Sequence, residues 1–166
     1  MEIKDAVLQI KTSDVIYVLP AAQINIDNIS AQIGKQVELK YIQVNVKVAE
    51  SPNSTVKVVE DTAAKGKMQL VVKPVDFEIN CINGDKEVEV SEFNGYVERL
   101  VAIPEGVDAS KITTGIVLNS DGTFSHVADS ITVIDGKYYA KINSLPTAHT
   151  LLSGIQGHLM MWLTIG

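Results

Sequence analysis

The sequence has few of the residues from which catalytic and metal sites are built. Its 166 residues include one cysteine, three histidines and one tryptophan, and only 5% of the chain is aromatic. Cys81 has no second cysteine to pair with, and its place in an apolar alternating run predicts a small buried side chain. No phosphate-binding Gly-rich loop, HExxH or CxxC motif is present. We therefore expect no enzyme activity, no catalytic residue, no metal site and no cofactor.

Positive charge is also scarce, with 14 Lys and Arg against 20 Asp and Glu and a net charge of -6. This balance argues against nucleic-acid binding and against adhesion to an anionic membrane surface, since both need a basic face. No apolar run is long enough for a transmembrane helix. Met1 leads into charged residues where a signal peptide needs an apolar core, so we expect none in this chain.

What the sequence does contain is alternation typical of β-strands. The run "YIQVNVKV" places Ile42, Val44, Val46 and Val48 on one face, and "DFEINCI" does the same with Phe77, Ile79 and Cys81. "KEVEVSEF" follows with Val88 and Val90 inward. Turn signals separate these runs: Asn83-Gly84, Asp121-Gly122 and Asp135-Gly136. The pattern predicts a mainly β fold, an antiparallel β-sandwich.

One or two short helices are also expected. "NIDNISAQIG" has Ile26, Ile29 and Ile33 on one face and Gly34 as a stop signal. A second helix from Ser54 to Gly66 would place Val56, Val59 and Ala63 on one side, although "TVKVV" also suits a strand.

The remaining candidates for a chemical role have simpler structural interpretations. His126 lies alone in a strand-like run, which favours a half-exposed structural histidine. The segment 119–123, "NSDGT", resembles part of a calcium loop but lacks the closing Glu, which favours a hairpin turn. Glu98 and Arg99 are adjacent in a strand, so they should point to opposite faces and have separate partners.

Tyr138 and Tyr139 could flank a sugar-binding platform. The interpretation we favour puts one ring in the core and the other on the surface. No spacing of carboxylates marks a glycoside-hydrolase pair. Among the residues up to 145, these two tyrosines are therefore the candidates for a ligand or partner surface.

The chain resembles a module found in bacterial cell-surface proteins directly before S-layer homology (SLH) domains. The resemblance covers most of residues 1–145 and includes "YVLPAAQINIDNISAQIG" and "VELKYIQVNVKV". Four segments carry it best: "PVDFEI" at 74–79, "NGYVERLVAIPEGVD" at 94–108, "KITTGIV" at 111–117 and "IDGKYYAKINSL" at 134–145. It implies a β-rich spacer on the bacterial cell surface, in the cell wall or S layer. Its partners would be neighbouring domains, and SLH domains would bind wall polysaccharide.

The chain changes character after Leu145. No Asp, Glu, Lys or Arg follows Lys141, and the tail carries Met160, Met161 and Trp162. In the family pattern "INSL" continues as Thr-Asn-Ser-Thr-Tyr-Ala, which can be written TTG ACC AAC AGC ACA TAC GCT from the Leu codon onward. Deleting the first base of ACC gives Leu-Pro-Thr-Ala-His-Thr, which is the sequence from Leu145 to Thr150.

The same phase fits further downstream. The codons from Met160 to Leu163, read one base out of step, give Asp, Val and then Ala or Val, as at the start of an SLH domain. We therefore divide the chain into a β-rich module, 1–145, and an atypical apolar tail, 146–166, that is a frameshifted remnant. The competing hypothesis is a genuine apolar end that docks on the sandwich or on a partner.

Such an apolar, uncharged tail should not lie free in water. We expect it to add a strand to its own sheet or, by β-augmentation, to that of a second copy. Met160, Met161 and Trp162 are therefore further candidates for a partner surface, including one for homo-oligomers.

The function expected from these observations is that of a non-catalytic structural or spacer module. The alternative is a carbohydrate-binding module of a surface-anchored polysaccharide-processing protein, which would need a planar row of exposed aromatic rings.

The frameshift hypothesis predicts the nucleotide sequence. Read one base out of phase from codon 145 onward, the gene should open into Asp-Val-Ala-Asp-His-Trp and continue as SLH repeats. Sequencing codons 140–166 and the bases that follow checks this. A stop codon at the start of the shifted frame would show that the tail is native.

Overall fold

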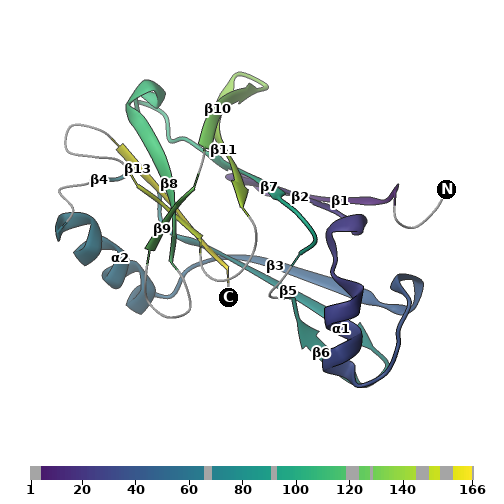
Figure 1. The fold of residues 1–166 in the computed structure, drawn as a ribbon. Coiled ribbons are helices and arrows are strands. Elements are labelled where there is room, and N and C mark those ends of the chain that lie inside the picture. Colours follow the sequence, from purple (N-terminus) through teal and green to yellow (C-terminus); the bar gives the residue numbers. More distant parts are fainter. Residues whose placement is uncertain are drawn as a thin grey trace.

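The computed structural model describes residues 5–65, 69–90, 93–118, 124–127, 129–144, 150–153 and 159–165, and Figure 1 shows their fold. Two sheets dominate it. The first sheet is antiparallel throughout, and its strands lie in the order β1-β2-β7-β11-β10. Their bounds are β1 Val7–Lys11, β2 Val15–Pro20, β7 Val97–Ala102, β11 Lys137–Ser144 and β10 Asp129–Ile134.

The second sheet follows the order β12-β8-β13-β5-β3, with β4, β6 and β9 beside β13, β5 and β8. These strands are β12 Thr150–Ser153, β8 Ile112–Leu118, β13 Leu159–Ile165, β5 Val75–Asn83, β3 Gln43–Glu50, β4 Gln69–Leu70, β6 Lys86–Glu89 and β9 Phe124–Val127. Its pairings are antiparallel except those of β13, which runs parallel to β8, β5 and β4. The expected mainly β, sandwich-like fold is confirmed.

The core lies between the two sheets. Alternate residues of β2, β7 and β11 face it from the first sheet, and Phe77, Ile79 and Cys81 of β5 face it from the second. The three valines of β3 predicted to share a face pack against the same cluster, and Val88 and Val90 are buried in it. The period of two therefore identified the inward residues of these strands correctly.

Two α-helices close the ends of the sandwich (Figure 1). α1 (Ile26–Ile33) begins at Asn25, whose side chain accepts a hydrogen bond from the Asn28 N–H, and ends at Gly34 with φ 81°. Its Ile29 and Ile33 enter the core. α2 (Asn53–Lys65) buries Val59 and Ala63, so both expected helices are present. No helix among the described residues is long and apolar enough to cross a membrane.

Three short 3-10 helices, η2 (Ala21–Gln23), η3 (Leu39–Tyr41) and η4 (Ala109–Lys111), complete the elements named in the described residues. The hairpin turns test the sequence signals one by one. Asp135 and Gly136 have φ 52° and 77°, the two positive values that a two-residue type I′ turn requires. The first hairpin differs from the prediction, because Asn83 pairs with Lys86 and the turn is made by Gly84 and Asp85. Only Gly84 has positive φ there, so Asn83 stays in the strand. Asp121-Gly122 lies outside the described residues.

The tail joins the second sheet. β12 pairs antiparallel with β8, and β13 lies between β8 on one side and β4 and β5 on the other. The prediction that the tail adds a strand to its own sheet is confirmed. The tail contributes two strands, and one of them is interior rather than at an edge.

A buried cation links the two sheets at the centre of the core. Arg99 of β7 is fully buried, and its guanidinium lies 5.3 Å from the ring centre of Tyr17 and 5.4 Å from that of Phe77. The two rings, from β2 and β5, are themselves 5.2 Å apart. Burial lowers the pKa of Arg99 to about 10, an effect that Tyr17 opposes. Arg99 therefore remains charged at neutral pH.

Removing the Phe77 ring tests how much this cluster stabilises the fold. Phe77→Ala should lower the free energy of unfolding by about 3–5 kcal/mol, because it leaves a cavity and takes one aromatic face from Arg99. Urea unfolding measures the change. Tyr41→Ala is the matched control: that ring is 64% exposed, so its loss should change the free energy by no more than about 0.5 kcal/mol. Equal effects of the two substitutions would contradict the conclusion that the Phe77 ring stabilises the fold.

Candidate functional site

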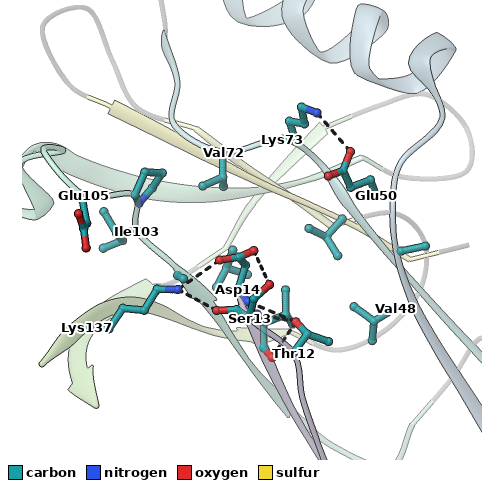
Figure 2. A pocket seen from close by; sticks show the side chains of 16 residues that line it. Thr12, Ser13, Asp14, Val48, Glu50, Val72, Lys73, Ile103, Glu105 and Lys137 are labelled. Atoms are coloured by element: carbon teal, nitrogen blue, oxygen red, sulfur yellow. Dashed lines mark hydrogen bonds and ion pairs between the residues drawn. The ribbon is translucent and has the colours of Figure 1, made fainter. Parts of the chain in front are cut away.

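The candidate site is a groove of about 600 Å³ between the two sheets. It is lined by the β1–β2 turn, the ends of β3 and β7, the chain entering β5, and Lys137 (Figure 2). Its apolar lining comes mainly from Val15, Val48, Val72, Val101 and Ile103. The volume lies within the range of small-molecule sites.

Two ion pairs lie at different parts of the rim (Figure 2). Lys73 Nζ is 3.2 Å from Glu50 Oε2, and Lys137 Nζ is 3.2 Å from Asp14 Oδ1. Lys137 also donates a 2.7 Å hydrogen bond to the Ser13 carbonyl. Since Lys11 lies 3.8 Å from Asp135, the tips of the β1–β2 and β10–β11 hairpins are joined by several polar contacts.

Local hydrogen bonds shape this rim. The Thr12 hydroxyl accepts from the N–H groups of Asp14 and Val15 and so holds the tight turn. A hydrogen bond from the Ser13 hydroxyl, with a smaller contribution from Lys137, lowers the pKa of Asp14. Asp14 is therefore ionised at neutral pH and is engaged in holding the two hairpins together.

The groove has little chemistry to offer a substrate. Both of its lysines are paired with carboxylates, and neither a cysteine nor a histidine belongs to its lining. Within the described ranges, no three His, Cys, Asp or Glu side chains are grouped so that they could hold a metal ion. The arrangement can admit an apolar group but assembles no nucleophile and base. Sequence reasoning missed the groove, although "KTSD" at 11–14 is a recognisable turn signal.

Tyr138 and Tyr139 lie on opposite faces of β11. Tyr139 is 4% exposed and packs with Ile16, Leu100 and Ala102 on the outer face of the first sheet. Tyr138 is 52% exposed. One ring is therefore buried and the other exposed, as expected, and the two cannot form a common platform.

The exposed tyrosines are also far apart. Tyr96 and Tyr138 lie at opposite ends of β7. Tyr96 comes just before the first residue of this strand, and the Tyr138 carbonyl accepts a hydrogen bond from the N–H of Ile103, just after its last residue. The strand rise places these two rings about 20 Å apart along the sheet. Tyr41, whose ring lies under Lys40, belongs to η3 near the β5–β6 turn. The described tyrosines thus do not form the planar row that a carbohydrate-binding module would use.

The structure settles several other predicted positions. The strand β13 contains Met160, Met161 and Trp162, and other strands pair with its backbone on both sides. The structure describes the backbone of these three residues and not their side chains. His126 lies in β9, as predicted for a strand residue. Glu98 pairs with Lys141 while Arg99 is buried, so these neighbours do have separate surroundings. Ser51 donates a hydrogen bond to Asp76 near the start of α2, a contact that the sequence did not indicate.

Cys81 is the one nucleophilic side chain whose reactivity can be predicted directly. It is fully buried, and burial raises its thiol pKa to about 11. At pH 8 only about one molecule in a thousand would carry the reactive thiolate. We expect iodoacetamide to leave the native protein unmodified and to alkylate it fully in concentrated guanidinium chloride, as mass spectrometry would show. Rapid alkylation of the native protein would contradict the burial of Cys81.

Comparisons with known proteins identify no relative. No family model, no curated protein and no solved structure matches the chain. Inference about function therefore draws on the residues themselves, on the resemblance they carry and on the geometry above.

Proposed function

We propose that this chain is a non-catalytic spacer module of a bacterial cell-envelope protein, of the kind that lies next to wall-anchoring SLH domains. Its place is then outside the cell, at the cell wall or S layer. Its partners are the neighbouring domains of the same protein, and wall polysaccharide is bound by the SLH domains rather than by this module.

One observation carries the proposal: the segments that resemble the SLH-associated module build the framework of the fold. Residues 74–79 begin β5, residues 94–108 contain β7 and its exit, residues 111–117 run from the end of η4 into β8, and residues 134–144 span the turn into β11 and that strand. They supply much of the core, including Phe77, Arg99 and Ile142, all fully buried. The resemblance therefore concerns how the module folds and not a reactive cluster.

The order of strands also suits a spacer. Within residues 1–145, the first sheet combines strands from early and late parts of the chain, because β1 and β2 lie with β10 and β11. Opening either sheet would expose the shared core, so the module should unfold as one cooperative unit. Such a unit can hold its neighbours at a fixed separation.

A wall-binding assay tests the proposal. The chain alone should remain in the supernatant when purified Gram-positive cell walls are sedimented, because its described surface has no basic patch or aromatic row for a polysaccharide. The same chain fused to a three-repeat SLH segment should sediment with the walls and saturate them. An SLH segment without the module is the matched control and should bind equally well.

Three results would contradict the proposal. They are saturable wall binding by the chain alone, a glycan-array signal abolished by Tyr138→Ala, and turnover of peptidoglycan or xylan. The first two would favour the carbohydrate-binding alternative and the third an enzyme.

A further inference from the structure

The edge strand β10 leaves one of its backbone edges unpaired among the described strands. In the first sheet, β11 pairs with it on one side and no described strand pairs with it on the other. Between Ser130 and Ile134 it has no charge, proline or glycine. By comparison, the edge strand β3 carries exposed Lys47 within the strand, paired with Glu78, whereas the charges nearest this part of β10 are Asp129 and Asp135 at its ends. Charges within an edge strand normally prevent edges from pairing.

The hairpin geometry identifies which backbone groups of β10 are free to pair. A two-residue type I′ turn makes its flanking residues, Ile134 and Lys137, a hydrogen-bonded pair. Antiparallel pairs alternate, so Thr132 and Ser130 also bond toward β11. The N–H and C=O groups of Ile131 and Val133 therefore point outward. The Tyr138 carbonyl, opposite Val133, agrees with this phase, because it bonds to Ile103 on the β7 side.

The side chains at this edge are apolar and exposed. Ile131 and Val133 are 38% and 54% exposed, and Tyr138, directly opposite Val133 on β11, is 52% exposed. All three lie on the face that carries Ala140 and Ile142 toward the core, but beyond the part that the second sheet buries. An edge that combines free backbone groups with an apolar face fits another β-strand.

We propose that β10 pairs antiparallel with β10 of a second copy of this chain about a twofold axis at Thr132. Ile131 then faces Val133 of the second copy, and Val133 faces its Ile131. This register uses all four outward groups of these two residues. It also keeps apolar side chains together on one face. Two rows of side chains cross the joined strands there, and each row contains Tyr138 and Val133 of one copy followed by Ile131 and Ala140 of the other. The first sheets of the two copies become one continuous sheet.

The match of Ile131 with Val133 across the twofold axis makes a second copy the occupant that this edge fits, whereas the charges around it oppose the pairing. Position 129 of one copy lies opposite position 135 of the other, and both are aspartates. Each copy also carries a net charge of -6. Only about five residues of each strand pair, whereas a standard interface uses about 20–30 residues and about 800 Å² of surface on each partner. The dimer is therefore weak and tightens as salt screens this repulsion.

Engineered cysteines test the register. Residues at a central pair that is not hydrogen-bonded have Cα atoms about 4.5 Å apart, within disulfide range. Thr132→Cys should therefore give a disulfide-linked dimer under mild oxidation, resolved on a non-reducing gel. Ser130→Cys is the matched control on the same face of the same strand. Its two copies would be about 13 Å apart and should stay mostly monomeric. Buried Cys81 does not interfere.

A pair of valine substitutions tests the edge. In the Thr132→Cys background, Val133→Lys should reduce cross-linking at least tenfold, because it places a charge on the paired face. Val7→Lys, on the opposite edge of the same sheet and 58% exposed, should leave cross-linking unchanged. Sedimentation equilibrium of the unmodified chain should show a monomer–dimer equilibrium shifted toward dimer by added salt.

Three outcomes would overturn the proposal. Equal cross-linking of the Thr132→Cys and Ser130→Cys variants would indicate random collision. Loss of association in Val7→Lys would indicate head-to-tail pairing of β1 with β10. A strict monomer at millimolar concentration and high salt, with no cross-linking of Thr132→Cys, would show that the edge does not pair with a second copy. None of these outcomes bears on wall binding, so this inference and the spacer proposal can fail separately.

Discussion

The buried Arg99 constrains the whole sandwich. A cation inside an apolar core is stable only if its surroundings replace the water that it has lost. Here the guanidinium lies against the ring of Tyr17, on the neighbouring strand of its own sheet, and that of Phe77, on the second sheet, so sliding one sheet over the other would take the Phe77 ring away from the charge. Burial raises the pKa of Tyr17 to about 12, although Arg99 lowers it, and reduces that of Arg99 to about 10.

The two titrations act in opposite directions. The raised pKa of Tyr17 contributes stability that is fully present below pH 10 and is lost as the pH rises toward 12. The lowered pKa of Arg99 reflects a cost of burying its charge, and that cost decreases as the pH rises above 10. Neither group changes charge between pH 5 and 9. The charges of the central cluster are therefore unaffected by pH across this range.

Local patterns predicted the elements of the fold much better than their partners. Phe77, Ile79 and Cys81 repeat at the strand period, and the Asn25 cap and Gly34 stop mark α1, because each of these signals depends on neighbours in sequence. The shift of one hairpin turn to Gly84 and Asp85 depends instead on pairing register. The parallel insertion of β13 between distant strands, and the burial of Arg99, depend on contacts across the chain that no local period encodes.

The candidate surfaces show the same limit. Alternation correctly placed Tyr138 and Tyr139 on opposite faces of the sheet. It did not predict which face is covered at that end: Tyr139 is buried on the outer face, and Tyr138 is exposed on the inner one. The groove was missed because Asp14 and Lys137 are 123 residues apart in sequence. Turn signals indicated both hairpins, but their tips meet because β2 and β11 flank the same strand, β7, and this strand order depends on long-range pairing.

For a spacer, the distinction between core and site loses much of its meaning. An enzyme can keep its function in a few exposed groups, whereas a spacer depends on the separation and orientation of its ends. In this chain the interior holds the ends in place: Arg99 lies against two rings, α1 closes one end and the hairpin tips are joined. Many residues in the segments that carry the family resemblance, such as Phe77, Arg99 and Ile142, are buried framework residues, which is what the proposed spacer function would require. Any lateral contact must then come from what the framework leaves open, which is the edges of its sheets.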